Sequence, residues 1–306
     1  MHIHVIDELG NTGDRPLHSL EVRLPEGPAF GGQNLRVSIE GVQVKPQRSS
    51  EVDARMMRAP FEPEWNQNEK RKIVTEWDLQ PENAVRGTIV ASPNGFFIAD
   101  ETAFPLWQTP HGLFATGGTD PDKELLAVSA PPDFRVLAPG KPLKPQADGS
   151  EIARRFLINP DVDSRTYVVA GRYQEKTVRT REGEVRFWTY RPIDESDAQM
   201  AAARLSRSMK TLEEFFGAAS DGKTSVRIAE APVELPAELR SAGEPGGASF
   251  PHGALLDPQA FQLGIANESV LQLAEYELTR TWFGWRVRPR PEAQILMGRG
   301  TGLFGL

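Results

Sequence analysis

The stretch that decides the fold lies near the end of the chain and reads Leu273-Ala274-Glu275-Tyr276-Glu277-Leu278-Thr279-Arg280-Thr281-Trp282-Phe283-Gly284. Ser269 and Gln272, just before it, have the spacing of a capping box. Apolar residues then recur at helical spacing, so we expect a helix from about 269 to 283. On this helix Tyr276 and Arg280 share one face, and most of the apolar side chains lie on another.

The same stretch resembles the catalytic helix of the alanyl-aminopeptidase family, the zinc aminopeptidases of the gluzincin class. That helix carries H-E-x-x-H followed by x-W-F-G, and a glutamate farther along the chain is the third zinc ligand. Glu277 and the tail Trp282-Phe283-Gly284 match this motif. Tyr276 and Arg280 stand at the two histidine positions, and Arg299 stands at the glutamate position. The resemblance implies a zinc-peptidase framework whose ligand positions are degenerate.

The residues at these positions predict that no zinc is bound. Zinc is held by imidazole, thiolate or carboxylate groups, whereas arginine has no lone pair to offer and stays protonated. Arg280 and Arg299 would also repel a dication. Glu277 keeps the place of the general base, but without a metal it has no acidified water to activate. We expect Glu277 to pair with Arg280, Arg299 or both, joining the helix to the downstream segment in place of the metal.

The resemblance continues upstream, at Gly246-Gly247-Ala248-Ser249-Phe250-Pro251-His252-Gly253. The family has a G-x-M-E-N or G-G-M-E-Y-P segment there, an edge strand whose glutamate holds the free amino terminus of the substrate. Ala248 and Ser249 stand at the methionine and glutamate positions, which implies that this amine anchor is missing. Residues 167–173 are similar to the family's strand leading into the catalytic domain, and 212–217 to a helix that ends in F-G.

The first half of the chain reads as all-β. Alternating runs such as 19–24 and 72–77 are separated by clusters of Pro, Gly and Asn, which is typical of a β-sandwich. The stretch 140–149 contains two prolines and reads as a linker. We therefore expect a β-sandwich domain at 1–145. Residues 146–306 are expected to form the N-terminal part of a zinc-aminopeptidase-like catalytic domain, an incomplete thermolysin-like α+β domain.

The second half alternates strands and helices. We expect strands at 165–173, 184–190 and 225–229, and a helix from about 196 to 216. Ser196 and Gln199 have the spacing of a capping box at the start of this helix. Gly217 stands where a glycine commonly ends a helix.

Composition limits the function classes. With 306 residues, a net charge of -7 and a pI near 5.4, the chain lacks the basic character of nucleic-acid and anionic-membrane binders. It contains no cysteine, which excludes disulfides, thiolate metal sites and a cysteine nucleophile. No apolar run is long enough to span a bilayer, and residues 1–7 lack the features of a signal peptide. The default expectation is a cytoplasmic protein, unless a signal or anchor was removed.

Three weaker motifs favour structural roles. His2 and His4 alternate on one strand face, as some metal ligands do, but an edge strand is the simpler interpretation. Gly247-Ala248-Ser249-Phe250-Pro251 approaches a nucleophile elbow, yet it ends in proline where that turn needs a small residue. The stretch 300–305 has the G-x-G-x-x-G spacing without the preceding strand of a dinucleotide site.

Three functions remain open from the sequence. The first is a non-catalytic pseudo-peptidase, a binding or scaffolding module for an unknown protein or peptide partner, without a cofactor. The second is an active hydrolase that relies on unrecognised residues or on a missing C-terminal part. The third is a structural part of a larger assembly. In the resembled family, further helices follow the position of Arg299, so we expect the chain to be a fragment of a longer protein.

Overall fold

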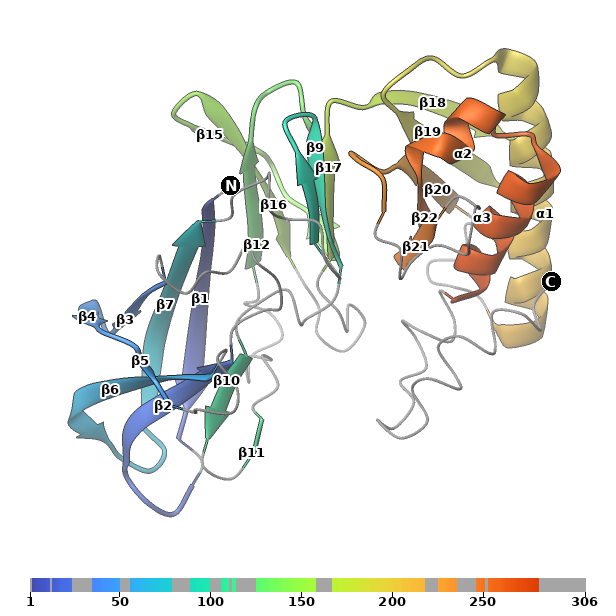
Figure 1. Cartoon of the computed structure of the whole chain (residues 1–306). Helices are drawn as coiled ribbons and strands as arrows, with labels where there is room; N and C mark the ends of the chain where they lie inside the picture. Colours follow the sequence, from blue (N-terminus) through green and yellow to red (C-terminus); the bar gives the residue numbers. More distant parts are fainter. Residues whose placement is uncertain are drawn as a thin grey trace.

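The computed structural model describes residues 2–11, 13–23, 35–49, 56–78, 89–99, 106–109, 112–113, 125–157, 167–217, 225–235, 246–250 and 253–280. This part of the chain is rich in β-strands and contains three helices, all of them in its second half (Figure 1). None of the described helices has an apolar stretch long enough to cross a membrane.

Two antiparallel sheets at the N-terminal end share one core. The first contains, in order, β1 (His2–Gly10), β7 (Lys70–Asp78), β3 (Arg36–Ile39) and β4 (Val42–Val44). The second contains β11 (Gly112–Leu113), β10 (Leu106–Thr109), β2 (Leu17–Arg23), β6 (Met56–Trp65) and β5 (Gln47–Arg48). Alternating apolar residues of both sheets meet in this core, including Leu20, Ile39, Trp65 and Ile73. The strands predicted at 19–24 and 72–77 are therefore present.

Two further antiparallel sheets follow and pack against each other. One contains β12 (Leu125–Ala130), β16 (Glu151–Leu157) and β14 (Lys141–Pro142), and β15 (Gln146–Asp148) also pairs with β16. The other contains β13 (Arg135–Leu137), β17 (Tyr167–Gly171), β9 (Gly95–Ala99) and β8 (Ile89–Ser92). Their shared core includes Ile98, Val128, Phe156 and Val168.

The predicted linker at 140–149 is wrong, because its residues form β14 and β15 and hydrogen-bond to β16. Proline is tolerated there because β14 is a short strand at the edge of its sheet. Strands on both sides of position 145 also share a sheet, since β17 lies between β13 and β9. The division into domains at 1–145 and 146–306 stays a prediction.

The last sheet is mixed and carries the helices. Its order is β18 (Gln174–Arg179), β19 (Glu184–Thr189), β20 (Ser225–Glu230), β22 (Gly253–Leu256) and β21 (Gly247–Phe250). β19, β20 and β22 run parallel to one another, and β21 pairs antiparallel with β22 at the edge. The edge strand and the strands predicted at 165–173, 184–190 and 225–229 are confirmed.

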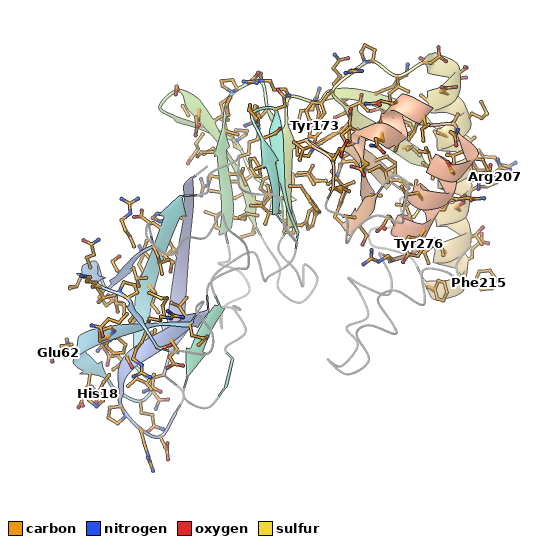
Figure 2. All side chains as sticks on the ribbon, viewed as in Figure 1. His18, Glu62, Tyr173, Arg207, Phe215 and Tyr276 are labelled. Carbon is orange, nitrogen blue, oxygen red and sulfur yellow. The ribbon has the colours of Figure 1, made fainter. Side chains whose placement is uncertain are left out.

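The helices cover one face of this mixed sheet, and the sheet containing β17 covers the other (Figure 1). They are α1 (Glu195–Phe216), α2 (Pro258–Leu263) and α3 (Glu268–Arg280). The helix-side core includes Phe187, Leu205, Met209, Ile228 and Leu278, and the opposite core includes Phe97, Tyr167, Trp188 and Phe250. Figure 2 shows Tyr173 where the two sheets meet, and its hydroxyl donates to the carbonyl oxygen of Glu230 at 2.8 Å.

α1 begins and ends for identifiable reasons. The Asp194 carboxylate caps it by accepting hydrogen bonds from the backbone N–H groups of Ser196, at 2.8 Å, and Asp197, at 3.3 Å. The capping box predicted at Ser196 is wrong, because a carboxylate two residues earlier takes these donors. Gly217 ends the helix with a φ of 87°, as predicted. Phe216, the last residue of α1, is 48% exposed.

α3 begins at Glu268, one residue before the predicted start. The Asn267 side-chain oxygen accepts from the Ser269 backbone N–H at 3.0 Å, so the predicted Ser269 cap is also wrong. Gln272 donates to Glu268 on the same helix. The predicted helix from 269 is confirmed up to Arg280, and its last predicted turn lies outside the described residues.

Candidate functional site

The candidate site lies where α3 packs on the edge strand β21. Gly247 approaches Glu277 so closely that a Cβ atom on this glycine would lie 2.8 Å from Glu277 Cγ. The same Cβ would lie 3.3 Å from Leu273 Cδ1. Gly247 therefore lets the helix and the strand come into contact, since any larger residue would force them apart.

Glu277 is a buried carboxylate, with 3% of its side chain exposed. Arg280, one helical turn later, donates to both carboxylate oxygens, at 3.1 Å to Oε2 and 3.4 Å to Oε1. The Arg280 guanidinium carbon lies 5.9 Å from the centre of the Tyr276 ring. Tyr276, Glu277 and Arg280 thus form one contiguous group on α3, and Figure 2 marks the position of Tyr276 on that helix.

The ion pair predicted between Glu277 and Arg280 is present, but it lies within α3. The predicted pairing with Arg299, and with it the link from α3 to the downstream segment, lies outside the described residues. Burial raises the pKa of the Glu277 carboxyl, and the positive charge and hydrogen bonds of Arg280 act in the opposite direction. Burial is the larger effect, so the pair compensates only part of the cost of desolvating the carboxylate.

β21 contributes the other predicted residues of the site. Ala248 and Ser249 are buried, and Ser249 pairs in register with Ala254 of β22. Gly247 to Phe250 form a strand rather than a strand-to-helix turn, which agrees with the rejection of a nucleophile elbow. Arg299 lies outside the described residues, as do the tail 282–284 and the glycine motif at 300–305.

Asp257, which the sequence did not single out, holds the segment around β21 in place. It is fully buried, and its Oδ1 accepts from the Leu235 backbone N–H at 2.7 Å. Its Oδ2 accepts from the Gly246 backbone N–H at 2.8 Å. The carboxylate therefore connects the chain after β20 with the residue just before β21, and it fixes where the edge strand starts.

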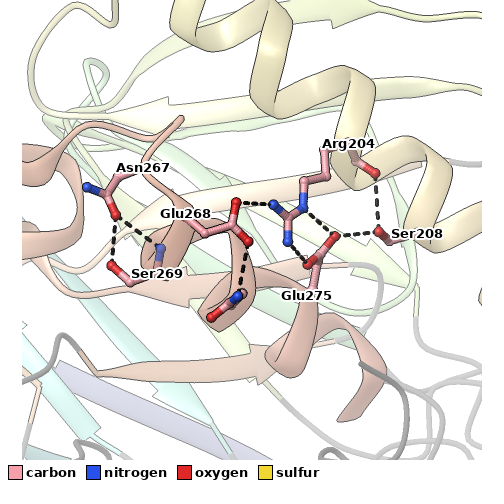
Figure 3. A network of polar contacts seen from close by, with 7 residues as sticks. Arg204, Ser208, Asn267, Glu268, Ser269 and Glu275 are labelled. Carbon is pink, nitrogen blue, oxygen red and sulfur yellow. Dashed lines mark hydrogen bonds and ion pairs between the residues drawn. The ribbon is translucent and has the colours of Figure 1, made fainter.

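A second unpredicted feature ties α3 to α1 (Figure 3). Arg204 of α1 donates through Nε and Nη2 to the two carboxylate oxygens of Glu275, at 2.9 and 2.8 Å. Its Nη1 donates to Glu268 at 2.6 Å, and Ser208 donates to Glu275 at 2.6 Å. These carboxylates raise the pKa of Arg204. Such a bidentate clamp fixes the position of α3 relative to α1 and hence to the sheet.

Within the described part of the chain, no His, Asp and Glu side chains form a group of three or more that could hold a metal ion. His4 instead lies 2.8 Å from a carboxylate oxygen of Glu76 on β7. β1 is the edge strand of its sheet, as predicted for His2 and His4.

Solved structures with a similar fold include a zinc metallopeptidase and two aminopeptidases. The M1 zinc metallopeptidase from Deinococcus radiodurans has a TM-score of 0.58 at 13% identity, with 99% of this chain and 64% of that chain covered. Aminopeptidase A from Legionella pneumophila, in complex with aspartic acid, has a TM-score of 0.62 at 15% identity, with 96% and 33% covered. An aminopeptidase N family protein from Idiomarina loihiensis has a TM-score of 0.57 at 14% identity, with 94% and 46% covered.

No protein-family model matches the chain, and no curated protein matches it by sequence. The chain spans less than two thirds of the length of the first structures that it resembles. At this level of identity the comparison concerns the fold alone. The described part of the chain therefore shares the β-rich fold of the zinc aminopeptidases, with α3 and β21 in contact at the edge of its mixed sheet.

Proposed function

We propose that this protein is a pseudo-peptidase: a zinc-aminopeptidase fold without a zinc site, acting as a binding or scaffolding module for a protein or peptide partner. In this proposal the N-terminal residues form a β-sandwich domain. The residues that follow form an incomplete thermolysin-like domain, with α3 in the place of the catalytic helix and β21 in the place of the substrate-binding edge strand.

The observation that carries the proposal is the group Tyr276, Glu277 and Arg280. Its donor set does not fit zinc, because the Arg280 guanidinium can only donate hydrogen bonds and Tyr276 offers a phenol in contact with that cation. The one carboxylate of the group already accepts from Arg280 and is buried. These contacts support a packing role for the residues at the degenerate ligand positions, which in our proposal include Arg299.

The degenerate amine anchor supports the same proposal. Ser249 stands on β21 where the resembled family has a glutamate, and a hydroxyl cannot neutralise the ammonium of a peptide amino terminus. Gly247 is in direct contact with Glu277, so the strand and the helix pack against each other at this point. A partner would therefore be recognised without the amine and metal contacts on which an aminopeptidase relies.

The test is hydrolysis of aminoacyl-nitroanilides by the full chain with added zinc, beside the Glu277→Gln variant. We expect no hydrolysis above the uncatalysed rate in either protein. Hydrolysis that Glu277→Gln abolishes would refute the proposal, because Glu277 would then be a general base. Hydrolysis that survives Glu277→Gln would instead support the alternative, an active hydrolase using other residues.

A further inference from the structure

A separate pocket lies at the carboxyl ends of β19 and β20, on the helix-covered side of the mixed sheet. Its volume is about 210 Å³. Its walls come from the loop between β19 and α1, the first turn of α1, the end of β20, and α2 with the turn that follows it. β19 and β20 are parallel, and the carboxyl ends of parallel strands are a common place for ligands. The described residues that line it do not include any of the β21–α3 site.

Glu230 at the end of β20 is the buried charged residue among those that line this pocket. Only 8% of the residue is exposed, and its Oε2 accepts from the Tyr190 backbone N–H at 2.8 Å. Among the described residues, its other oxygen, Oε1, has no hydrogen-bond partner. Burial raises the pKa of Glu230, and the charge of Arg191 acts in the opposite direction. Oε1 is not enclosed by protein atoms, and Glu230 lines the pocket, so a hydrogen-bond donor that enters the pocket can reach this oxygen.

The charges around the pocket favour a cation. Asp194 and Asp197 line it together with Glu230, against the single basic residue Arg191 within the described lining. The Oδ1 atom of Asp194 accepts a capping hydrogen bond at the start of α1. Asp197 lies half-buried on the first turn of that helix. The remaining walls are largely apolar and include Pro192, Ile193, Pro258, Phe261 and Ile265.

An organic cation fits this lining better than a metal ion. The carboxylates are not clustered as metal ligands anywhere in the described part of the chain. A hydrated divalent ion would also gain nothing from the apolar walls, whereas a hydrocarbon chain would be removed from water there.

We propose that this pocket binds a primary ammonium group carried on a short hydrocarbon chain. The ammonium donates to Glu230 Oε1 and to the Asp197 carboxylate, and the hydrocarbon packs against Ile193 and Phe261. This site goes beyond the pseudo-peptidase proposal and does not depend on it, because it uses neither Glu277 nor β21.

The experiment is calorimetric titration of the full chain with n-butylammonium and, in parallel, with the neutral n-butanol. For so small a ligand in a matching pocket we expect a dissociation constant of about 1 mM for the ammonium and no measurable binding of the alcohol. Glu230→Gln keeps the size and the acceptor for Tyr190 but removes the charge, so it should weaken binding about tenfold or more. Asp197→Asn should weaken it as well.

Glu214→Gln is the matched control, because Glu214 is an exposed carboxylate at the far end of the same helix. It should leave binding unchanged. Equal binding of the alcohol, or unchanged affinity in both Glu230→Gln and Asp197→Asn, would overturn the proposal. If Glu230→Gln fails to fold, the Asp197→Asn variant decides alone, and absence of any binding to the unmodified chain overturns the proposal as well.

Discussion

Replacing Glu277 by glutamine should change how the stability of the protein depends on pH. Burial raises the pKa of the Glu277 carboxyl above its ordinary value of 4.5, so the folded protein holds this proton more tightly than the unfolded chain does. A group of this kind favours folding below its unfolded pKa, and that contribution is lost as pH rises through the folded pKa. The slope is at most about 1.4 kcal/mol per pH unit within this window.

The Glu277→Gln substitution introduces a neutral side chain of the same shape, which can still accept a hydrogen bond from Arg280. At about pH 4.5 the variant should therefore be nearly as stable as the unmodified chain. As pH rises to about 8, we expect the unmodified chain to lose about 1–2 kcal/mol relative to the variant, because only it must carry a buried charge. The Arg280 side chain is 27% exposed, so solvent screens its interaction with Glu277. We therefore expect a smaller stability difference than for a fully buried ion pair.

Urea unfolding of both proteins at several pH values between about 4.5 and 8 measures this difference. Glu268→Gln is the control, since Glu268 lies on the same helix and Arg204 lowers its pKa. Because the pKa of Glu268 is lowered, its ion pair stabilises the folded protein above the ordinary carboxyl pKa and is lost only as pH falls below it. The stability difference between Glu268→Gln and the unmodified chain should therefore change little over the tested range. Parallel stability curves for the unmodified chain and Glu277→Gln would show that this prediction is wrong, because they would mean that Arg280 fully compensates the burial of the charge.

Three further sets of substitutions test the framework around the site. Arg204→Ala and Glu275→Ala should each cost about 1–2 kcal/mol, and a double-mutant cycle should show a favourable coupling, because the two side chains form a partly exposed bidentate pair. Gly247→Ala should cost about 1–3 kcal/mol, since the added Cβ would lie 2.8 Å from Glu277 Cγ. Asp257→Asn should cost about 1–3 kcal/mol, because one of its two buried backbone donors would face an amide NH₂.

Each of these costs can be read from thermal or urea unfolding. Gly10→Ala is the control for Gly247→Ala, because a Cβ at Gly10 would only make an ordinary contact, 3.8 Å from Lys70 Cγ. Zero coupling between Arg204 and Glu275 would show that the clamp does not hold α3. An Asp257→Asn variant as stable as the unmodified chain would mean that water can satisfy the donor left behind.

Local features of the fold could be predicted from the sequence. The helical spacing of apolar residues predicted α1 and most of α3, and Gly217 predicted where α1 ends. The exact caps could not be predicted in the same way. Asp194 and Ser196 are both good capping residues by type, and only the backbone geometry decides which side chain reaches the free N–H groups.

Long-range features could not be predicted from one sequence. Arg204 and Glu275 are 71 residues apart, and Asp257 reaches two backbone donors on either side of an intervening segment. The role of Glu230 could not be predicted from the sequence, because a single glutamate at the end of a strand does not indicate a binding site. Its position beside a pocket depends on how β19, β20 and α2 meet. The motif around Glu277 was visible because its residues are neighbours on one helix.

The most direct test of the pseudo-peptidase proposal is the zinc content of the full chain after dialysis against micromolar zinc and removal of loosely bound metal. A matched variant restores the family's ligands through Tyr276→His, Arg280→His and Arg299→Glu. We expect no retained zinc in the unmodified chain and uptake of about one zinc per chain by the variant. About one tightly held zinc in the unmodified chain would show that the pseudo-peptidase proposal is wrong.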